Sequence, residues 1–508
     1  MHFILLALLV GSKIAPAIRS ALSAANHGVL EKSMTVNDSS HPATLSGQTA
    51  ADLPIPDLSV PDLSVPDLSV PDLSVDVLIV GGGMVGLTLA VALGGAGMRL
   101  ALIDRADPAT FLDAGFDGRV SAIAAGSRHV LEALGLWHGL SGGAEPIRDI
   151  RVTEANSSLF IHFDHAELAR GDFSKRLMRS LDRAPSVEDS PAQVAAQPFG
   201  HIVENRHIRA VLMDRLGQMP NVSLLAPVEL IDVVNEPARA VARLSDGKRI
   251  AANLVVGAEG RESMLRQSRG IAATRWSYPQ TAIVCTVTHA LPHGGVAHER
   301  FFPVGPFAIL PMTDSKDATG HISHRSSLVW VERADLAPTM VKLGAEDFDG
   351  EIARRFGDFL GEVRAVGPRW SYPLGLMHAE RYTDERLALI GDAAHAIHPL
   401  AGQGLNLGIR DVAALAEVLV DARRLGLDIG FGEVLSRYES WRRTDNVALA
   451  AVTDGLNRLF SNTIAPLALA RDLGLAAVNR VPPLKRFFMR HAMGLVGDLP
   501  RLVKGEPL

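Results

Sequence analysis

Asp392, His395 and His398 lie close together in the segment "LIGDAAHAIHPLAGQGLNLGIRD", residues 389–411. Carboxylate and imidazole groups at this spacing could hold a metal ion. Pro399 follows directly, however, and disfavours helical geometry at His398, and no further cluster of His, Cys or Glu stands nearby to supply a fourth ligand. We therefore predict that the segment binds no metal. Its histidines are expected to make structural hydrogen bonds, with proton handling as the alternative.

The same segment is typical of a strand, a glycine turn and a helix. Residues 386–390 predict a buried strand, Gly391 ends it, and Asp392 follows at the edge where open α/β sheets bind ligands. A tight turn at Gly402 and Gly404 precedes a long helix, whose N-terminus would stabilise a ring that becomes anionic. A reduced flavin is such a ring and a nicotinamide is not, so the segment favours FAD, with Asp392 bonding a polyol chain. An ordinary strand-turn-helix with incidental polar residues is the alternative.

A second set of informative residues lies near the start of the predicted fold. "DVLIV", residues 76–80, is a branched apolar run typical of a buried parallel strand. "GGGMVG" follows, with Gly81 for a tight turn, Gly83 for close approach to a pyrophosphate and Gly86 for close helix packing. Asp104 ends the next apolar run, where a carboxylate can accept hydrogen bonds from ribose hydroxyls. This order of elements predicts a dinucleotide site without choosing between NAD and FAD.

The composition of the whole chain excludes several other classes of protein. Its 508 residues suggest two or three domains, and 47% hydrophobic and 21% charged residues are ordinary globular values. Cys285 is the single cysteine, so an intrachain disulfide, a Cys-rich metal site and a CxxC redox pair are excluded. The net charge of −6 gives no reason to expect nucleic acid. These values fit a cytoplasmic enzyme.

The first 75 residues have a different character. "FILLALLV", residues 3–10, is apolar but too short for a spanning helix, which needs about 20 residues. It has the length of a signal-peptide core, and a true translation start at Met34 is the alternative. Four copies of PDLSV then occupy residues 56–75. Proline at every fifth position forbids a continuous helix or a central strand, so we predict an extended tether and expect the fold to begin at Asp76.

Apolar patterns predict the remaining elements. Residues 205–216 have a helical apolar face, and residues 252–266 are typical of a buried strand that runs through a glycine turn into a helix. Residues 280–332 contain several strand-like runs, which suggests a separate sheet domain. Residues 412–508 are mostly helical by the same criterion. The predicted fold class is α/β, with a Rossmann-like nucleotide domain interleaved with a mixed β-sheet domain and followed by a helical C-terminal region.

Three motifs resemble those of a known family. "DVLIVGGGMVG", "GAEGRESMLR" and "LIGDAAHAIHPLAGQGLNLGIRD" resemble the FAD-dependent aromatic hydroxylases of the para-hydroxybenzoate hydroxylase fold. "WSYPQTAIVCTV", "HERFFPVGPFAILPM" and the tail "LVKGEPL" are similar to the ubiquinone-biosynthesis hydroxylases within that class. The resemblance covers residues 75 to 508, and "HPLAGQGLN" is highly specific for the hydroxylases.

The resemblance implies that the chain is divided into interleaved parts. Residues 1–75 would form a disordered N-terminal extension, and residues 421–508 a helical C-terminal region. The FAD-binding domain would be discontinuous and comprise residues 76–150, 200–268 and 375–420. The substrate-binding sheet domain would comprise residues 151–199 and 269–374.

The resemblance also implies roles for individual residues. Arg119, in "FDGRVSAIAAGS", matches the arginine that reaches the FAD phosphates and ribityl region, and Asn205 is a looser match to a further flavin contact. Asp392 matches the ribityl-binding aspartate, and Pro399 is expected to form a wall of the pocket beside the flavin. The predicted cofactor-binding set is Gly81, Gly83, Gly86, Asp104, Arg119, Asn205, Glu259, Asp392, Gly402, Gly404, Leu405 and Asn406.

Glu259 is a departure from the family pattern. The family usually has Gly-Ala-Asp-Gly where this chain has Gly-Ala-Glu-Gly, and the motif is associated with both FAD and NAD(P)H. A glutamate side chain is one methylene longer than an aspartate, so its hydrogen bonds need a different geometry. The preference for a nicotinamide cofactor and the rate of flavin reduction are therefore left open.

The reaction implied by the resemblance is hydroxylation of an aromatic ring with NAD(P)H and O2, through a flavin C4a-hydroperoxide. The expected substrate is a polyprenyl-phenol intermediate of ubiquinone biosynthesis. The alternatives are another small aromatic substrate, or a non-catalytic flavin-binding subunit of a biosynthetic complex. NAD(P)H should bind transiently as co-substrate, because the chain has no second GxGxxG motif.

Residues 480–504 mix basic and apolar side chains. This mixture suits peripheral contact with the inner face of a membrane or with a biosynthetic complex. A packed C-terminal helix with a solvated basic side is the alternative.

Overall fold

The computed structural model has a compact unit at Pro71–Leu508. The residues whose structure is described all lie in this unit: 71–112, 119–154, 160–168, 197–316, 319–398, 402–460 and 481–508. The apolar run near the N-terminus and the first three PDLSV copies lie outside these residues. Their predicted roles as a signal-like segment and a tether therefore stay predictions.

The fold begins before Asp76, the start that the sequence predicted. Strand β1 spans Leu73–Val80, so its first three residues come from the last PDLSV copy. Leu73 pairs in parallel register with Ile250 of a neighbouring strand. The prediction was wrong because it applied the restriction on proline to the whole repeat. Pro71 precedes the strand, where its missing N–H removes no ladder hydrogen bond.

The first sheet contains the strand that leads into the predicted dinucleotide motif. Its eight strands run in the order β17-β18-β11-β1-β2-β8, with β10 beside β11 and β9 beside β10. Val77, Leu78 and Ile79 of β1 have no exposed surface, as expected for branched residues in a parallel sheet covered on both faces. The strands are β1 (Leu73–Val80), β2 (Leu100–Ile103), β8 (Val222–Leu225), β9 (Leu230–Glu236), β10 (Arg239–Leu244), β11 (Arg249–Gly257), β17 (Thr383–Asp384) and β18 (Leu387–Leu389).

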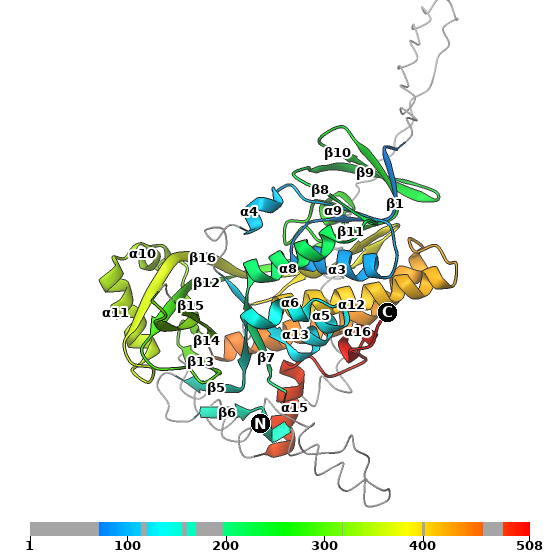
Figure 1. Cartoon of the computed structure of the whole chain (residues 1–508). Coiled ribbons are helices and arrows are strands. Elements are labelled where there is room, and N and C mark those ends of the chain that lie inside the picture. Colours follow the sequence, from blue (N-terminus) through cyan, green and yellow to red (C-terminus); the bar gives the residue numbers. More distant parts are fainter. Residues whose placement is uncertain are drawn as a thin grey trace, which may run out of the picture. The chain divides into compact units, whose positions relative to one another are not determined.

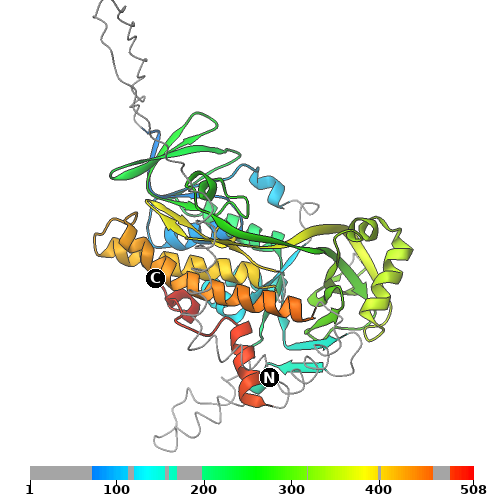
Figure 2. The same cartoon turned by 180° about the vertical axis from the view of Figure 1, so that it is seen from behind.

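Four helices accompany this sheet: α3 (Met84–Gly95), α8 (Asn205–Gly217), α12 (Gln403–Arg424) and α13 (Gly432–Phe460). Helix α3 packs against α8 and α12, and α12 packs in turn against α13. Figure 2 shows α12 and α13 running alongside each other, in yellow and orange. The buried face of α12 includes Leu407, Val412, Leu415 and Leu419, the apolar residues that predicted the helix.

The second sheet is the mixed β-sheet that the sequence predicted. Its order is β19-β16-β12-β15-β14-β13-β5-β6. One face is covered by α10 (Ala337–Lys342) and α11 (Ala345–Phe356), and Phe307 and Trp330 share a buried cluster with Phe348 there (Figure 1). The strands are β5 (Asp149–Glu154), β6 (Phe160–Asp164), β12 (Ala273–His289), β13 (Val296–Phe302), β14 (Gly305–Lys316), β15 (Ile322–Arg333), β16 (Val363–Ala379) and β19 (His395–Ala396).

A third sheet, with the order β3-β7-β4, connects the two parts. It packs against the second sheet through Ile202 and Met312, and β3 also contacts α12. Its strands are β3 (Val120–Ala124), β4 (Ala144–Ile147) and β7 (Gly200–Glu204). The remaining short elements are α4 (Pro108–Leu112), α5 (Ala125–Ala133), α6 (Trp137–Leu140), η1 (Ser141–Gly143), α9 (Met264–Ser268), η3 (Gly391–Ala393), α15 (Pro482–Ala492) and α16 (Arg501–Lys504).

The chain alternates between the first and second sheets along its length. β5 and β6 belong to the second sheet, β8 to β11 to the first, and β12 to β16 to the second again. The predicted boundary between residues 374 and 375 falls inside β16, which continues to Ala379. The division into an FAD-binding and a substrate-binding domain stays our proposal.

Candidate functional site

The glycine turn after β1 is tightly packed at two positions and open at a third. Gly81 has a φ of 111°, and a Cβ there would lie 2.5 Å from the Ala258 carbonyl oxygen. A Cβ on Gly86 would lie 2.0 Å from the Gly81 carbonyl oxygen. Gly83, which caps the N-terminus of α3, has no heavy atom within 4 Å of the position of a Cβ. The turn therefore excludes side chains at Gly81 and Gly86 and leaves space at the start of the helix.

Asp104 follows β2 and lies against this turn. Its Oδ2 atom accepts a hydrogen bond of 2.5 Å from the Gly82 amide, and its Oδ1 atom accepts one of 2.7 Å from the Ala106 amide. Each carboxylate oxygen can accept a second donor. The carboxylate is half-buried, so it can still receive a hydroxyl group.

The second glycine turn follows β18. Gly391 has a φ of 57°, which glycine adopts without strain. Asp392 comes next, and its Oδ2 atom lies 3.4 Å from Nε of Arg261. About half of each side chain is exposed, 46% for Asp392 and 43% for Arg261. Because exposed ion pairs contribute little, the Asp392 carboxylate is available to another donor.

Val85 joins the two turns. It lies in the first turn of α3, and a Cβ on Gly391 would be 3.3 Å from its Cγ1 atom. A Cβ on Gly408 of α12 would be 2.6 Å from its Cγ2 atom. The start of α3, the turn after β18 and the first turns of α12 are therefore packed together around one side chain.

The N-terminus of α12 is held by backbone contacts with β3. Gly402 adopts the left-handed conformation with a φ of 63°. Asn406 is buried. Its side-chain Oδ1 atom accepts a hydrogen bond of 2.9 Å from the backbone amide of Ala124, and its Nδ2 atom donates one of 2.8 Å to the Ala122 carbonyl. Gly404 has no heavy atom within 4 Å of a Cβ position, so this helix end is also open.

The other predicted residues of this loop differ in what the structure describes. Leu405 is partly buried and packs against the hydrophobic core. The side-chain amide of Asn406 hydrogen-bonds to β3, so Asn406 positions the start of α12. Pro399 lies outside the described residues, so its place in the wall of a pocket stays a prediction.

Arg119 and Asn205 lie at one junction. Arg119 immediately precedes β3, and its guanidinium carbon lies 4.7 Å from the ring centre of Tyr372 in β16. The backbone amide of Asn205 donates a hydrogen bond of 3.0 Å to the Arg119 carbonyl, and the side-chain Oδ1 atom of Asn205 accepts one of 2.7 Å from Ser121 Oγ. The structure thus joins the start of α8 to β3 and to the second sheet at this point.

Glu259 caps a helix. Its carboxylate accepts hydrogen bonds from Ser263 Oγ at 2.5 Å, from the Met264 amide at 3.2 Å and from the Leu265 amide at 3.4 Å. Burial raises the pKa of Glu259, and these hydrogen bonds counteract part of that effect. The additional methylene lets the carboxylate reach the N-terminus of α9. A direct contact between Glu259 and a cofactor stays a prediction.

Asp392, His395 and His398 face different partners. His395 Nε2 lies 2.5 Å from Asp411 Oδ2, with both side chains buried, which is the structural hydrogen bond preferred from the sequence. The His398 ring packs edge-on to Tyr278 at 5.2 Å between centres, and burial lowers its pKa to about 4. In the part of the chain that the structure describes, these three do not form a group that could share a metal ion.

The sequence reasoning missed residues that support the second turn from behind. Arg266 is buried and donates 2.7 Å to the Ala393 carbonyl and 2.6 Å to the Arg261 carbonyl. Asp411 accepts 3.0 Å from the Gly391 amide, and Arg442 donates 2.8 Å to Asp411. Arg266 and Asp411 are the last residues of two quoted motifs, but helical spacing gives no sign of which backbone groups they reach.

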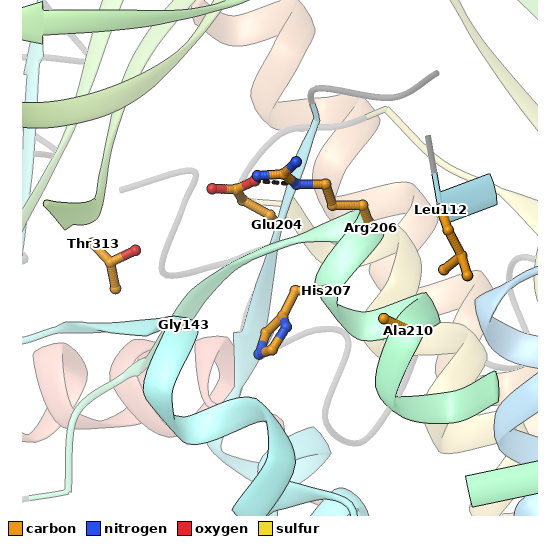
Figure 3. Close-up of a pocket in the computed structure, with 7 residues that line it drawn as sticks. All are labelled: Leu112, Gly143, Glu204, Arg206, His207, Ala210 and Thr313. Carbon is orange, nitrogen blue, oxygen red and sulfur yellow. Dashed lines mark hydrogen bonds and ion pairs between the residues drawn. The ribbon is translucent and has the colours of Figure 1, made fainter. Parts of the chain in front are cut away.

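A pocket of about 400 Å³ lies beside the first turn of α8. Figure 3 shows the Glu204 carboxylate paired with the Arg206 guanidinium beside the pocket, and His207 next to Arg206 on α8. Glu204 Oε2 and Arg206 Nε are 2.8 Å apart. Arg325 also reaches Glu204, at 3.2 Å. Because Asn205 lies between Glu204 and Arg206 in the chain, the pocket adjoins the junction described above. Its lining residues are Leu112, Gly143, Glu204, Arg206, His207, Ala210 and Thr313.

Comparison with known proteins decides which nucleotide these turns serve. A family model described as "FAD binding domain" matches residues 74–444, most of the chain. The chain belongs to this family of FAD-binding proteins. Both glycine turns of this flavoprotein lie within the matched segment.

Curated relatives and solved structures agree with this assignment. The flavoprotein is 51% identical over 436 residues to the ubiquinone hydroxylase UbiL of Rhodospirillum rubrum, covering 85% of this chain and 93% of the relative. It is 35% identical to the 3-demethoxyubiquinol 3-hydroxylase of Escherichia coli, covering 83% and 98%. It shares its fold with p-nitrophenol 4-monooxygenase PnpA from Pseudomonas putida, with a TM-score of 0.65, 20% identity and 84% and 99% coverage.

The open positions of the flavoprotein fit an FAD molecule. A dinucleotide needs free N–H groups for its pyrophosphate and carboxylates for its sugar hydroxyls. The space at Gly83 at the start of α3 would provide the first, and Asp104 and Asp392 would provide the second. The open start of α12 at Gly404 would supply a positive helix end for the flavin ring.

Proposed function

We propose that this flavoprotein is an FAD-dependent monooxygenase that uses NAD(P)H and O2 to hydroxylate the aromatic ring of a polyprenyl-phenol intermediate of ubiquinone biosynthesis. The observation that carries the proposal is the packing of α3, the Gly391 turn and α12 around Val85, which brings both halves of a dinucleotide site together. The names of the relatives support the substrate class, since one is a ubiquinone hydroxylase and another a 3-demethoxyubiquinol 3-hydroxylase.

The residues of the chain have separate binding tasks in this proposal. Gly81, Gly83 and Gly86 shape the start of α3 for the pyrophosphate, and Asp104 accepts from the ribose next to the adenine. Asp392 accepts from the ribityl hydroxyls. Arg119 and Asn205 lie where β3 meets the start of α8. Their cofactor contacts are part of the proposal.

Other residues would prepare the reacting part of the cofactor. Bound FAD supplies the chemistry, which is hydride acceptance from NAD(P)H followed by activation of O2 for transfer of one oxygen atom to the ring. The positive end of α12, at Gly402 and Gly404, would stabilise negative charge on the flavin ring. Asn406 fixes that helix end through its hydrogen bonds to β3. The second sheet would exclude water from the reacting atoms.

The central test combines cofactor analysis with turnover. The purified protein should carry a yellow cofactor that releases FAD on denaturation. A soluble short-chain prenylphenol should increase its NAD(P)H oxidation and appear as a hydroxylated product that carries ¹⁸O from ¹⁸O2. FAD binding without substrate-stimulated oxidation would favour the non-catalytic subunit instead. A protein that binds no FAD would contradict the whole proposal.

We further propose that α15 contacts the membrane that holds a prenylated substrate. Val481 and Phe487 are 42% and 41% exposed, and Arg486 and Arg490 belong to the same short stretch. Lys485 does not join them, because it is buried and paired with Glu167 at 2.7 Å. Exposed aromatic and basic side chains on one helix suit an anionic lipid surface. Among the helices that the structure describes, none has the length and apolarity needed to cross a bilayer.

The membrane proposal needs substitutions, because a truncation would damage the core. Met489 of α15 and Leu502 of α16 are buried, so removing residues 480–508 would uncover apolar surface. Phe487→Ser combined with Arg486→Glu should abolish flotation of the protein with vesicles that contain anionic lipid. Leu425→Ser is the control, since Leu425 is 73% exposed on another surface. Equal flotation of both variants would contradict this proposal.

A further inference from the structure

Asp411 of α12 accepts hydrogen bonds from four donors on three different segments. Its Oδ2 atom accepts from the Gly391 amide at 3.0 Å and from His395 Nε2 at 2.5 Å. Its Oδ1 atom accepts from Arg442 Nε at 2.8 Å and from Asn446 Nδ2 at 3.3 Å. A carboxylate has about four lone-pair sites, so the acceptor capacity of Asp411 is fully used.

The group lies in the interior of the protein. The Asp411 side chain has no exposed surface, and those of His395 and Arg442 are 2% exposed. Burial would raise the pKa of Asp411, but His395 and Arg442 together hold it below its usual range. The carboxylate is therefore ionised in the folded protein, where an ion without such partners would be very costly.

Helix α13 supplies two of the four donors and is itself tied into the same group. Arg442 donates to Asp445 at 2.7 Å and to Asn446 Oδ1 at 2.7 Å, in addition to Asp411. Asn446 also donates 3.3 Å to the hydroxyl of Tyr382, which lies 2.9 Å from His378 Nε2. The position of the Asp411 carboxylate is thus determined from α13.

The Gly391 amide gives this group a link to the cofactor site. Gly391 precedes Asp392 and belongs to the turn that packs on Val85. A buried ion pair contributes little net stability compared with an apolar replacement, so stability alone does not account for four charged or polar side chains here. A fixed acceptor for the Gly391 amide orients the peptide from which the Asp392 carboxylate projects.

We propose that Asp411 is a positioning residue for the cofactor, through which α13 fixes the Gly391–Asp392 turn and so controls FAD retention. The inference rests on the proposed function, since it assigns Asp392 to the ribityl chain. It extends that function by making Arg442 and Asn446 of α13, which hydrogen-bond to Asp411, determinants of FAD affinity. Arg442 and Asn446 would act on the cofactor indirectly, through their hydrogen bonds to Asp411.

The test compares FAD binding by the apoprotein of three variants. Asp411→Asn retains the shape of the side chain but removes the charge and half of the acceptor sites. Leaving a buried donor unsatisfied costs about 1 to 3 kcal/mol, which corresponds to about a fivefold to 150-fold change in affinity. We expect the FAD dissociation constant of Asp411→Asn to rise by about tenfold or more, with an altered visible spectrum of the bound flavin. Asn446→Ala removes one donor and should raise it by about threefold.

Asp428→Asn is the matched control. Asp428 accepts from the buried Arg386 at 2.6 Å and from the Gly430 amide at 2.9 Å. It therefore resembles Asp411 in pairing one arginine and one backbone amide, although its side chain is 43% exposed, and its hydrogen bonds are to Arg386 and Gly430 and not to the Gly391 turn. Its variant should lose thermal stability and keep the FAD dissociation constant and the flavin spectrum of the wild type.

The outcomes separate this inference from the proposed function. One contrary result is that Asp411→Asn and Asn446→Ala lower the melting temperature as Asp428→Asn does and leave the FAD dissociation constant unchanged. That result would overturn the inference and leave the proposed function standing. If Asp411→Asn does not fold, Asn446→Ala decides by the same measurements. A wild-type apoprotein that fails to bind FAD would overturn both.

Discussion

At the scale of single residues, glycines serve two distinct purposes in this site. Gly81 and Gly86 are required by the protein itself, because a Cβ at either would overlap a backbone carbonyl. Gly83 and Gly404 have open space around them. A side chain there would cost the apoprotein nothing and would instead occupy space that we assign to the cofactor.

Gly404→Ala tests this distinction. Alanine is a better helix former than glycine by up to about 1 kcal/mol, so the apoprotein should melt at the same or a higher temperature. The FAD dissociation constant should rise by about tenfold, because a methyl group would displace the flavin from the helix end. Gly350→Ala, at an equally open position in α11, should leave FAD binding unchanged. Unaltered FAD affinity in Gly404→Ala would exclude a flavin at this helix end.

A residue-scale prediction also follows from Glu259. Aspartate, the usual residue of the family, is too short to reach the Met264 and Leu265 amides from this backbone position. Glu259→Asp should therefore weaken the cap of α9 and lower the free energy of unfolding by about 1 kcal/mol, measured by denaturant titration. Ser263→Ala, which removes the other capping side chain of the same helix, provides the comparison. A stabilised Glu259→Asp variant would show that the cap does not depend on the longer side chain.

Glycine spacing predicted where both turns lie, because close backbone packing requires glycine at fixed offsets. The cofactor contacts of the site residues stay predictions. For Asn406 the structure adds hydrogen bonds between its side-chain amide and β3, which the sequence did not indicate. Asp411 was quoted only as the end of a motif. Its four donors are up to 35 residues away in sequence, and no local pattern encodes such contacts.

At the scale of elements, the sequence predicted strands and helices where apolar periodicity was strong. Burial of β1 and α12 follows the residues that predicted them. The start of β1 was wrong by three residues, 76 − 73, because the repeat was treated as one unit. The second sheet was predicted as a set of strand-like runs, but its order could not be, since β5 and β13 pair across more than a hundred residues.

Strand β13 contains a carboxyl group whose surroundings predict a pH effect. Glu299 lies between Ala297 and Phe301 on one face, and its partners on neighbouring strands are Ala308 and Val152. Burial raises the pKa of Glu299 from an ordinary 4.5 to about 7. The folded state therefore holds the proton more strongly than the unfolded state. The stability that this provides is complete below pH 4.5 and is lost as the pH rises through 7.

Glu299→Gln removes the ionisable group and keeps its shape. The variant should melt at a higher temperature than the wild type at pH 8, where the wild type has to bury a charge, and at the same temperature at pH 4. Glu262→Gln, on a side chain that is 75% exposed, should show no pH-dependent gain. A gain of equal size at both pH values would mean that the pKa of Glu299 is the same in the folded and unfolded states.

At the scale of the whole molecule, buried histidines predict an acid limit to stability. Burial lowers the pKa of His201, His298, His378 and His398 from 6.5 to about 4. Between these values the unfolded chain binds more protons than the folded one, so stability falls as the pH falls. The melting temperature should decline progressively from pH 6.5 towards pH 4. Replacing His298 with asparagine should flatten this decline in proportion, and an unchanged slope would remove His298 from the account.

The interleaving of two sheets by one chain was predicted from strand-like runs and from the family resemblance, and the course of β16 shows why a boundary at residue 374 could not be exact. β16 runs to Ala379 and pairs with β19 at His395–Ala396, so the turn after β18 is flanked on both sides by segments of the second sheet. No single residue separates the two sheets there. Between Ala379 and Ala396 the chain leaves β16 of the second sheet, passes through β17 and β18 of the first sheet, and returns to the second sheet at β19.

The first three residues of β1, 73–75, belong to the last PDLSV copy, and this overlap has a genetic consequence. Every copy ends in the same Leu-Ser-Val, so a deletion or duplication of whole copies leaves the same residues joined to Asp76. The strand that pairs with β11 would then be rebuilt unchanged from whichever copy comes last. Loss or gain of five-residue units in the gene can therefore alter the length of the N-terminal segment without altering the edge of the folded unit.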